Sequence, residues 1–157
     1  MMKIKIRKAN KKDIPGLVEL HKKSSDYHRK IDKIYASNTN SNRAYKDFLL
    51  NDITKRTLRI IIAEDDVKLI GFISAKIKRT DPYTAPPKVG IIIDGFVESR
   101  YQKMGIGHRM TKEMFLWFKK NKIKCVMLDA DSRNKIGLHA WQKYGFKEFR
   151  KRMIINL

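Results

Sequence analysis

The residues that most clearly suit chemistry are Gln-Lys-Met-Gly-Ile-Gly, at positions 102–107. The apolar run VGIIIDGFV (89–97) precedes them, and a helical pattern follows. A turn that joins a strand to a helix exposes main-chain N–H groups, and the helix N-terminus adds partial positive charge. Gly105 and Gly107 have no Cβ atom, so a phosphate can come close to the main chain, and Lys103 adds a cation. The stretch indicates an anion-binding site, with a tight turn that binds nothing as the alternative.

Two common nucleotide-binding motifs do not match this stretch. A Walker loop needs G-x-x-x-x-G-K-[ST], which the residues from Gly95 onward do not supply. A dinucleotide fingerprint needs a third glycine where Met110 stands. Nucleotide hydrolysis and nicotinamide binding are therefore disfavoured.

The elements that must position this turn show both strand and helix patterns. Strands are predicted at residues 3–9, 58–64, 69–78, 89–97, 125–130, 146–149 and 152–157. The 89–97 strand is apolar enough to be buried on both faces, and Gly95 weakens it locally, so a bulge or a close backbone approach is expected there. A polar loop is predicted at 37–42, a turn at 65–68 and a proline-rich loop at 79–88.

Helices are predicted after Asn10, which can act as a cap with Asp13 as its capping-box partner, and at 44–55. A third follows the glycines and ends near Asn121, and its core face is predicted from the helical spacing of Met110, Met114, Trp117 and Phe118. A fourth is predicted at 134–145. Residues 1–157 are therefore interpreted as one mixed α/β domain.

Composition limits the choice of partners. The 36 basic and 16 acidic residues give a net charge of +20, which suits RNA, DNA, ribosomes or a phosphate-bearing cofactor, or simply reflects solvated lysine-rich faces. The single cysteine, Cys125, lies in an apolar stretch and is expected to be a buried thiol, not a metal ligand or part of a disulfide. No apolar run is long enough to span a bilayer and the first residues do not resemble a signal peptide, so a cytoplasmic protein is expected.

Two separated segments resemble the GNAT superfamily of acyl-CoA-dependent N-acyltransferases. The family's central motif, [QR]-x-x-G-x-[GA], lies between the fourth strand and the next helix, and FVESRYQKMGIG (96–107) resembles it. LDADSRNKIGLHAWQKYGF (128–146) is similar to the family's fifth strand, its asparagine, here Asn134, and its helix-ending Gly-Phe pair. IRKANKKDIPGLVEL (6–20) is similar to the opening strand and helix, so the resemblance covers nearly the whole chain.

The resemblance implies a mixed, mostly antiparallel central sheet that is splayed between its fourth and fifth strands and flanked by helices. It also implies acetyl-CoA, or another acyl-CoA, with its pyrophosphate on the N–H groups of the turn and its pantetheine in the splay. No metal is expected. Asn134 can equally serve as a helix cap. The implied cofactor-binding residues are Val97, Gln102, Lys103, Met104, Gly105, Ile106, Gly107 and Asn134.

N-acylation needs a neutral amine, so a base must remove the ammonium proton. Asp94 is an isolated acid in an apolar strand, where burial can raise its pKa, and it is either that base or a group that satisfies the backbone at a bulge. The family's usual tyrosine, seven residues after the asparagine, is replaced by Trp141, which cannot readily act as an acid. Tyr144, one helical turn further on, is the remaining candidate acid, with a packing role as the alternative.

Three functions are compared on these grounds. The first is an N-acetyltransferase that moves an acetyl group from acetyl-CoA to a primary amine of a protein or a small molecule. The second is a non-catalytic acyl-CoA sensor or adaptor, suggested by Trp141. The third is a nucleic-acid or ribosome-binding module, suggested by the charge of +20. The charge also favours anionic or ribosome-associated protein partners over free cationic amines.

Overall fold

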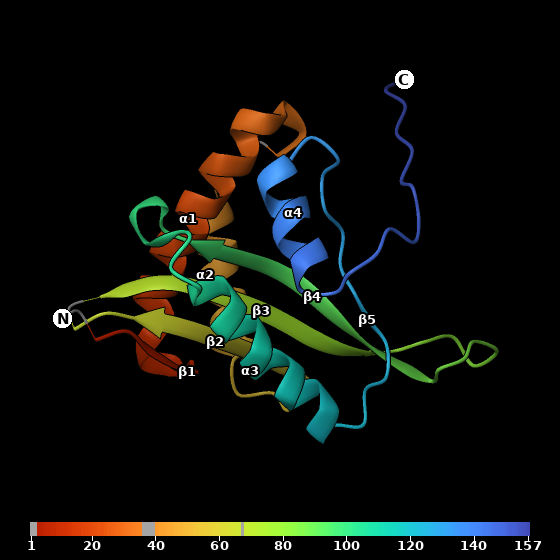
Figure 1. Ribbon diagram of the computed structural model, residues 1–157, viewed down its shortest axis with the longest axis horizontal. Helices are drawn as coiled ribbons and strands as arrows, with labels where there is room; N and C mark the ends of the chain where they lie inside the picture. The colour runs from red at the N-terminus through yellow and green to blue at the C-terminus, as the bar shows by residue number, and fades with distance from the viewer. Residues whose placement is uncertain (1–2, 36–39, 67) are drawn as a thin grey trace.

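The computed structural model describes residues 3–35, 40–66 and 68–157. Its strands form one mixed sheet in the order β1-β2-β3-β4-β5 (Figure 1). The pairs from β1 to β4 are antiparallel, and β4 and β5 are parallel. This is the mixed α/β architecture expected from the sequence. The strands are β1 (Lys5–Lys8), β2 (Leu58–Glu64), β3 (Leu69–Arg79), β4 (Lys88–Val97) and β5 (Val126–Met127).

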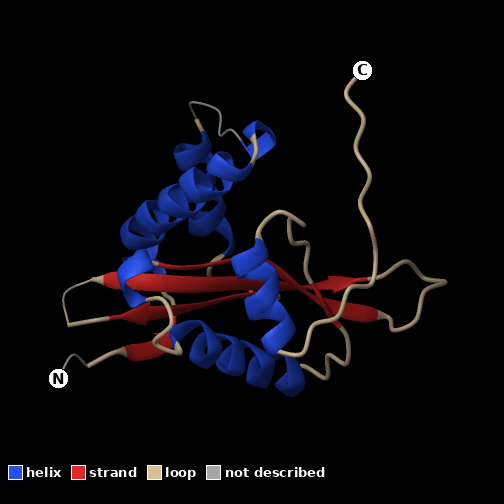
Figure 2. Cartoon of the chain, turned by 45° about the horizontal axis from the view of Figure 1, so that its top comes forward, coloured by secondary structure: helices blue, strands red, loops and turns tan. Residues whose placement is uncertain are grey.

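Helices cover both faces of the sheet (Figure 2). Helices α1 (Ile14–Ile31) and α2 (Ser41–Asp52) lie on one face, and α3 (Ile106–Lys120) lies on the other. Helix α4 (Lys135–Lys143) follows β5 and packs through Trp141 against the core beneath α3. Three short 3-10 helices join these elements: η1 (Lys11–Asp13), η2 (Lys33–Tyr35) and η3 (Ser99–Tyr101).

The core face predicted from spacing for α3 is the face that the structure buries. Met110, Met114, Trp117 and Phe118 of α3 are all buried, as are Ile14 and Leu17 of α1. The β-branched residues of β2 and β3 contribute to the core on both faces of the sheet. None of the helices in the described ranges is long and apolar enough to cross a membrane.

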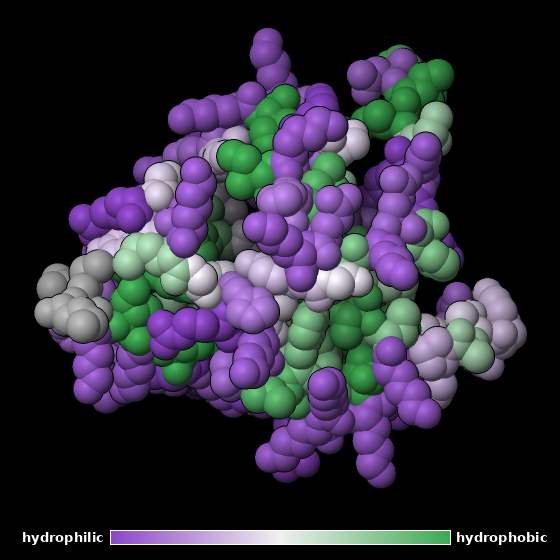
Figure 3. Space-filling model, in the orientation of Figure 1, coloured by the Kyte–Doolittle hydropathy of each residue, from purple (hydrophilic) through white to green (hydrophobic). Residues whose placement is uncertain are grey.

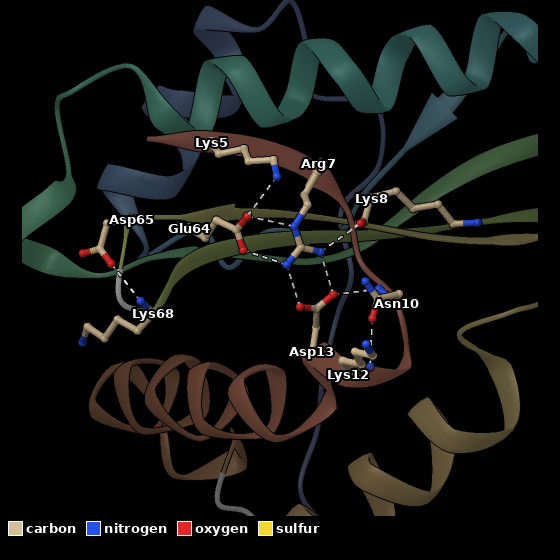
Figure 4. Close-up of polar contacts among 9 residues, drawn as sticks. All are labelled: Lys5, Arg7, Lys8, Asn10, Lys12, Asp13, Glu64, Asp65 and Lys68. Carbon is tan, nitrogen blue, oxygen red and sulfur yellow. Dashed lines mark hydrogen bonds and ion pairs between the residues drawn. The ribbon is translucent and has the colours of Figure 1, made fainter. Parts of the chain in front are cut away.

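The start of α1 is fixed to the sheet by one guanidinium group (Figure 4). Arg7 of β1 donates two hydrogen bonds to Asp13, both at 2.8 Å, and two to Glu64 of β2, at 2.9 and 2.6 Å. These bonds hold the pKa of both carboxyl groups below the usual range. Asp13 also accepts from the main chain of Asn10, and the Asn10 side chain accepts from Lys12, which confirms the predicted capping box.

The edge of β4 that faces β5 is open over most of its length. Only Gly90 and Ile91 pair with β5, so residues 92–97 have no strand partner on that side within the described chain. A bulge lies in the same region, because Ser74 pairs with Asp94 and Ala75 with Ile92, which leaves Ile93 unpaired. The implied splay between the fourth and fifth strands is confirmed, and the bulge lies two residues before the predicted Gly95. We call residues 92–97 the open edge of β4.

Several local predictions are wrong. Residues 146–149 and 152–157 form no strand, and the chain leaves the body there with Phe149 75% and Ile155 79% exposed (Figure 1). The reason is that β5 has two residues rather than the predicted six, so its outer edge offers no ladder. The second half of β4 is only partly buried because it borders the open edge, and Cys125 is half-buried. Parts of the predicted 37–42 loop and 65–68 turn lie outside the described residues.

Candidate active site

The 102–107 turn connects the open edge of β4 to the N-terminus of α3. Buried Tyr101 precedes it and Ile106, 1% exposed, anchors its end in the core, while residues 102–105 are exposed. Gly105 has a φ of 74° and Lys103 a φ of 63°, both in the left-handed region. Two buried anchors and two left-handed residues therefore turn the main chain outward between them.

Main-chain N–H groups of this turn are available to a ligand. In the described chain, the amides of Lys103 to Gly107 have no main-chain hydrogen-bond partner, whereas the amide of Gln102 donates to Ser99. A Cβ atom on Gly105 would meet nothing within 4 Å, so the space above the turn is open. Because these amides lie at the positive end of α3, the turn can hold an anion such as a diphosphate.

The first two of the implied cofactor residues contact each other. Val97 ends β4, and its carbonyl accepts a hydrogen bond from the side-chain nitrogen of Gln102 at 3.0 Å. The Gln102 side chain therefore closes the turn back onto the strand. The side chains of Lys103 and Met104 are exposed, so the turn presents both its amides and a cation to solvent.

Asp94 lies on β4 beside α1. Its carboxylate accepts from the amide of Gly95 at 2.7 Å and from the hydroxyl of buried Ser24 at 3.3 Å. Burial raises the pKa of Asp94, and nearby His21 and His28 oppose that increase. A carboxyl group with a raised pKa can take a proton at neutral pH more readily than an ordinary aspartate.

Two aromatic side chains complete the surroundings of Asp94. His21 of α1 stacks on Tyr45 of α2 with ring centroids 3.7 Å apart. His21 Nδ1 and the Tyr45 hydroxyl are buried and have no hydrogen-bond partner among the residues that the structure describes. Burial lowers the pKa of His21 and raises the pKa of Tyr45, so both rings favour their neutral forms.

Helix α4 contacts a different element at each of three positions. At its start, Asn134 accepts hydrogen bonds from the Gly137 amide and from the Tyr27 hydroxyl of α1, both at 3.0 Å. Near its end, the Trp141 ring lies 3.6 Å from where a Cβ of Gly95 would be. At its end, the Tyr144 hydroxyl lies 3.0 Å from a Cβ placed on Gly107.

This arrangement brings some of the predicted residues together and separates others. Tyr144 lies at the 102–107 turn, where its ring is 5.6 Å from that of His108 and burial raises its pKa. Asp94 instead contacts α1, through the hydroxyl of Ser24. Asn134 has the capping role proposed as its alternative, and its interaction with a cofactor stays a prediction.

Sequence reasoning missed the residues that α1 contributes. Ser24 and Tyr27 contact Asp94 and Asn134, which lie 70 and 107 residues further along the chain. No local motif marks them. The available signal was polar residues among the buried positions of an amphipathic helix, since a buried serine needs a partner.

The matched family agrees with this geometry. The family model described as "Acetyltransferase (GNAT) family" matches residues 18–146, which is most of the chain. The chain belongs to this family. No curated protein sequence matches the chain.

Solved structures share the fold over nearly the full length. A protein of Clostridium acetobutylicum described as a predicted acetyltransferase, solved with acetyl-CoA, has a TM-score of 0.80 at 23% identity, covering 98% of this chain and 96% of its own. The aminoglycoside N-acetyltransferase AAC(6')-Iy with CoA has a TM-score of 0.80 at 18% identity, covering 100% and 96%. The same enzyme, solved with a bisubstrate analogue of CoA and acetylneamine, has a TM-score of 0.75 at 20% identity, covering 99% of this chain and 98% of its own.

Proposed function

We propose that this chain transfers an acetyl group from acetyl-CoA to a primary amine. The observation that carries the proposal is the row of main-chain amides from Lys103 to Gly107, which have no main-chain partner in the described chain, next to the open edge of β4. A diphosphate needs such amides, and a pantetheine arm, which carries its own amide groups, needs an unpaired strand edge. Both features occur side by side here.

The residues present suit this co-substrate. The amides of residues 103–107 bind the diphosphate, and Lys103 adds positive charge. Gly105 leaves room for the phosphates because no atom lies within 4 Å of its Cβ position. The main chain of the open edge up to Val97 pairs with the pantetheine, and Asn134 flanks it from α4. When bound, acetyl-CoA supplies an activated thioester.

Asp94 carries the proton chemistry in this proposal. It lies at the bulge of β4, and its raised pKa suits a base that removes a proton from an ammonium group, directly or through one water. The neutral amine then attacks the thioester carbonyl. Ser24 orients the carboxylate by donating a hydrogen bond to it.

The acceptor is proposed as a class, the primary amines. The similar enzyme AAC(6')-Iy was solved with an analogue that joins CoA to an aminoglycoside, which supports a small amine or a protein amine reaching the same face. The charge of +20 favours an acceptor carried on an anionic or ribosome-associated partner in the cytoplasm.

Two measurements test this function. A thermal-shift titration compares acetyl-CoA, CoA and NAD, and a ligand at 100 times its Kd stabilises the native state by about 2.7 kcal/mol. Release of CoA is then measured with a panel of N-terminal peptides, lysine peptides, polyamines and aminoglycosides. Acetyl-CoA stabilisation with turnover of one amine supports the proposal. No stabilisation by acetyl-CoA contradicts it.

Binding without turnover supports the second candidate, an acyl-CoA sensor. The observation in its favour is Trp141, which occupies the position of the family's usual tyrosine. Its ring packs at Gly95. Binding of RNA or DNA that weakens steeply with salt would instead support the nucleic-acid module.

A further inference from the structure

The proposed transfer releases a thiolate, and helix α4 offers no phenol near Asp94 to protonate it. Trp141 lies against Gly95, the residue after Asp94, and its indole N–H is only a donor. The phenol of Tyr144 is further along α4, at Gly107 and His108. It therefore lies at the diphosphate end of the open edge.

Helix α1 does place a phenol at the Asp94 end. Ser24 and Tyr27 are three residues apart, so their side chains leave adjacent turns of the same helix face. Ser24 reaches Asp94 on β4, and Tyr27 reaches Asn134 at the start of α4. Helix α1 therefore contacts both Asp94 and the start of α4, through two side chains that lie one turn apart.

The surrounding contacts keep Tyr27 in this place. Its ring packs edge to face on His28, with centroids 5.5 Å apart. Two neighbouring bonds join the same pair of segments: Tyr35 donates to Asp131 at 2.8 Å, and Arg133 donates to Asp32 at 2.5 Å. These contacts hold the end of α1 and η2 against the loop between β5 and α4.

The hydroxyl of Tyr27 is nevertheless free to change partner. The residue is 37% exposed, so water can return a proton to it. Asn134 keeps its bond from the Gly137 amide when Tyr27 leaves. The exchange of partner therefore leaves no side-chain oxygen of Asn134 without a donor.

We propose that Tyr27 is the general acid of this enzyme and protonates the departing sulfur of CoA. The amine nitrogen forms the new C–N bond, the C–S bond breaks with its electron pair on sulfur, and the Tyr27 O–H proton passes to sulfur. The proton from the amine leaves through Asp94 or water, and water then reprotonates the phenolate. This inference rests on the proposed acetyl transfer.

The test compares Tyr27→Phe with Tyr83→Phe, a control at an 89% exposed position in the β3–β4 loop. We expect Tyr27→Phe to lower kcat by about 10- to 100-fold, at the low end of general-acid effects because a thiolate leaves readily. The Kd for acetyl-CoA and the melting temperature should stay close to those of wild type. Tyr83→Phe should change nothing. An unchanged kcat in Tyr27→Phe, or an equal loss in the control, overturns the inference.

A rescue variant separates acid catalysis from a structural role. In the Tyr27→Phe background, Trp141→Tyr restores a phenol at the family's usual position, and we expect it to recover at least fivefold in kcat. The assignment is overturned if Tyr27→Phe weakens acetyl-CoA binding and leaves kcat unchanged. It is also overturned if Trp141→Tyr folds but does not restore kcat in the Tyr27→Phe background. If the wild-type protein acetylates no amine, the proposed function is contradicted, and the role of Tyr27 is contradicted with it.

Discussion

The 102–107 turn presents main-chain N–H groups, whereas the other end of the open edge presents side chains from three segments: Ser24 and Tyr27 on α1, Asp94 on β4 and Asn134 before α4. The turn is formed by consecutive residues, and its geometry depends on two left-handed residues and two buried anchors. The side-chain end depends on how helices dock on the sheet. Substitutions should therefore affect binding at the turn and chemistry at the side-chain end.

The largest expected effect is on Asp94. Asp94→Asn keeps the shape of the side chain but removes the base, so kcat should fall by about 100- to 1,000-fold while acetyl-CoA binding is unchanged. Because burial raises the pKa of Asp94, wild-type kcat should fall with decreasing pH at a value above the usual aspartate pKa of about 3.9. Asp81→Asn, in the exposed β3–β4 loop, is the control of equal charge. Full activity of Asp94→Asn would contradict its role as the base.

The next effect is on binding at the turn. Gly105→Asp adds a carboxylate where phosphates are expected, and the Kd for acetyl-CoA measured by calorimetry should rise about 100-fold by charge repulsion. Space is available and aspartate tolerates this φ, so the protein should fold. Gly105→Asn has the same shape without the charge and should weaken binding much less. Equal effects of both variants would show that charge at this position does not matter.

A stability effect should appear at the anchor of α1. Arg7→Met leaves Asp13 and Glu64 without their shared cation, and the free energy of unfolding should fall by about 2 kcal/mol. Lys5→Met removes a 65% exposed cation from the same Glu64 and should cost no more than about 0.5 kcal/mol. A comparable loss in both variants in urea unfolding would mean that the guanidinium has no special role.

The same anchor predicts a pH dependence. The pKa values of Asp13 and Glu64 are lowered in the folded state, so their contribution to stability is complete above their unfolded pKa values of about 4. It is lost as the pH falls through the folded values. Arg7→Met should therefore show a flatter loss of stability below pH 4, measured by urea unfolding across the acid range.

The smallest expected effect distinguishes the contribution of the Lys103 amide to acetyl-CoA binding from that of its side chain. Lys103→Gly keeps the amide and relieves the left-handed conformation, so acetyl-CoA affinity should change by less than about threefold and stability should rise by up to about 1 kcal/mol. Lys122→Gly, at a φ of 58° after α3, should give the same stability change with no effect on affinity. A large loss of affinity in Lys103→Gly would assign binding to the lysine side chain.

The same contrast explains what could be predicted from the sequence. The 102–107 turn, the β2–β3 hairpin and the core face of α3 depend on residues close together in the chain, so their spacing was sufficient to predict them. The contact of Tyr27 with Asn134 depends on docking across 107 residues, which no local pattern encodes. The chain after Gly145 alternates like a strand but finds no edge, because β5 ends after Met127. Periodicity predicts a preferred conformation, and only the assembled sheet decides whether a partner strand exists.

The central claim is that the amides of residues 103–107 bind the diphosphate of acetyl-CoA. The most direct test is a ¹⁵N–¹H NMR titration of the labelled protein with acetyl-CoA, with assigned amide signals. We expect the largest shifts at Lys103 to Gly107, followed by the open edge of β4, and no comparable change with NAD. Binding of acetyl-CoA that leaves these five amide signals in place would contradict it.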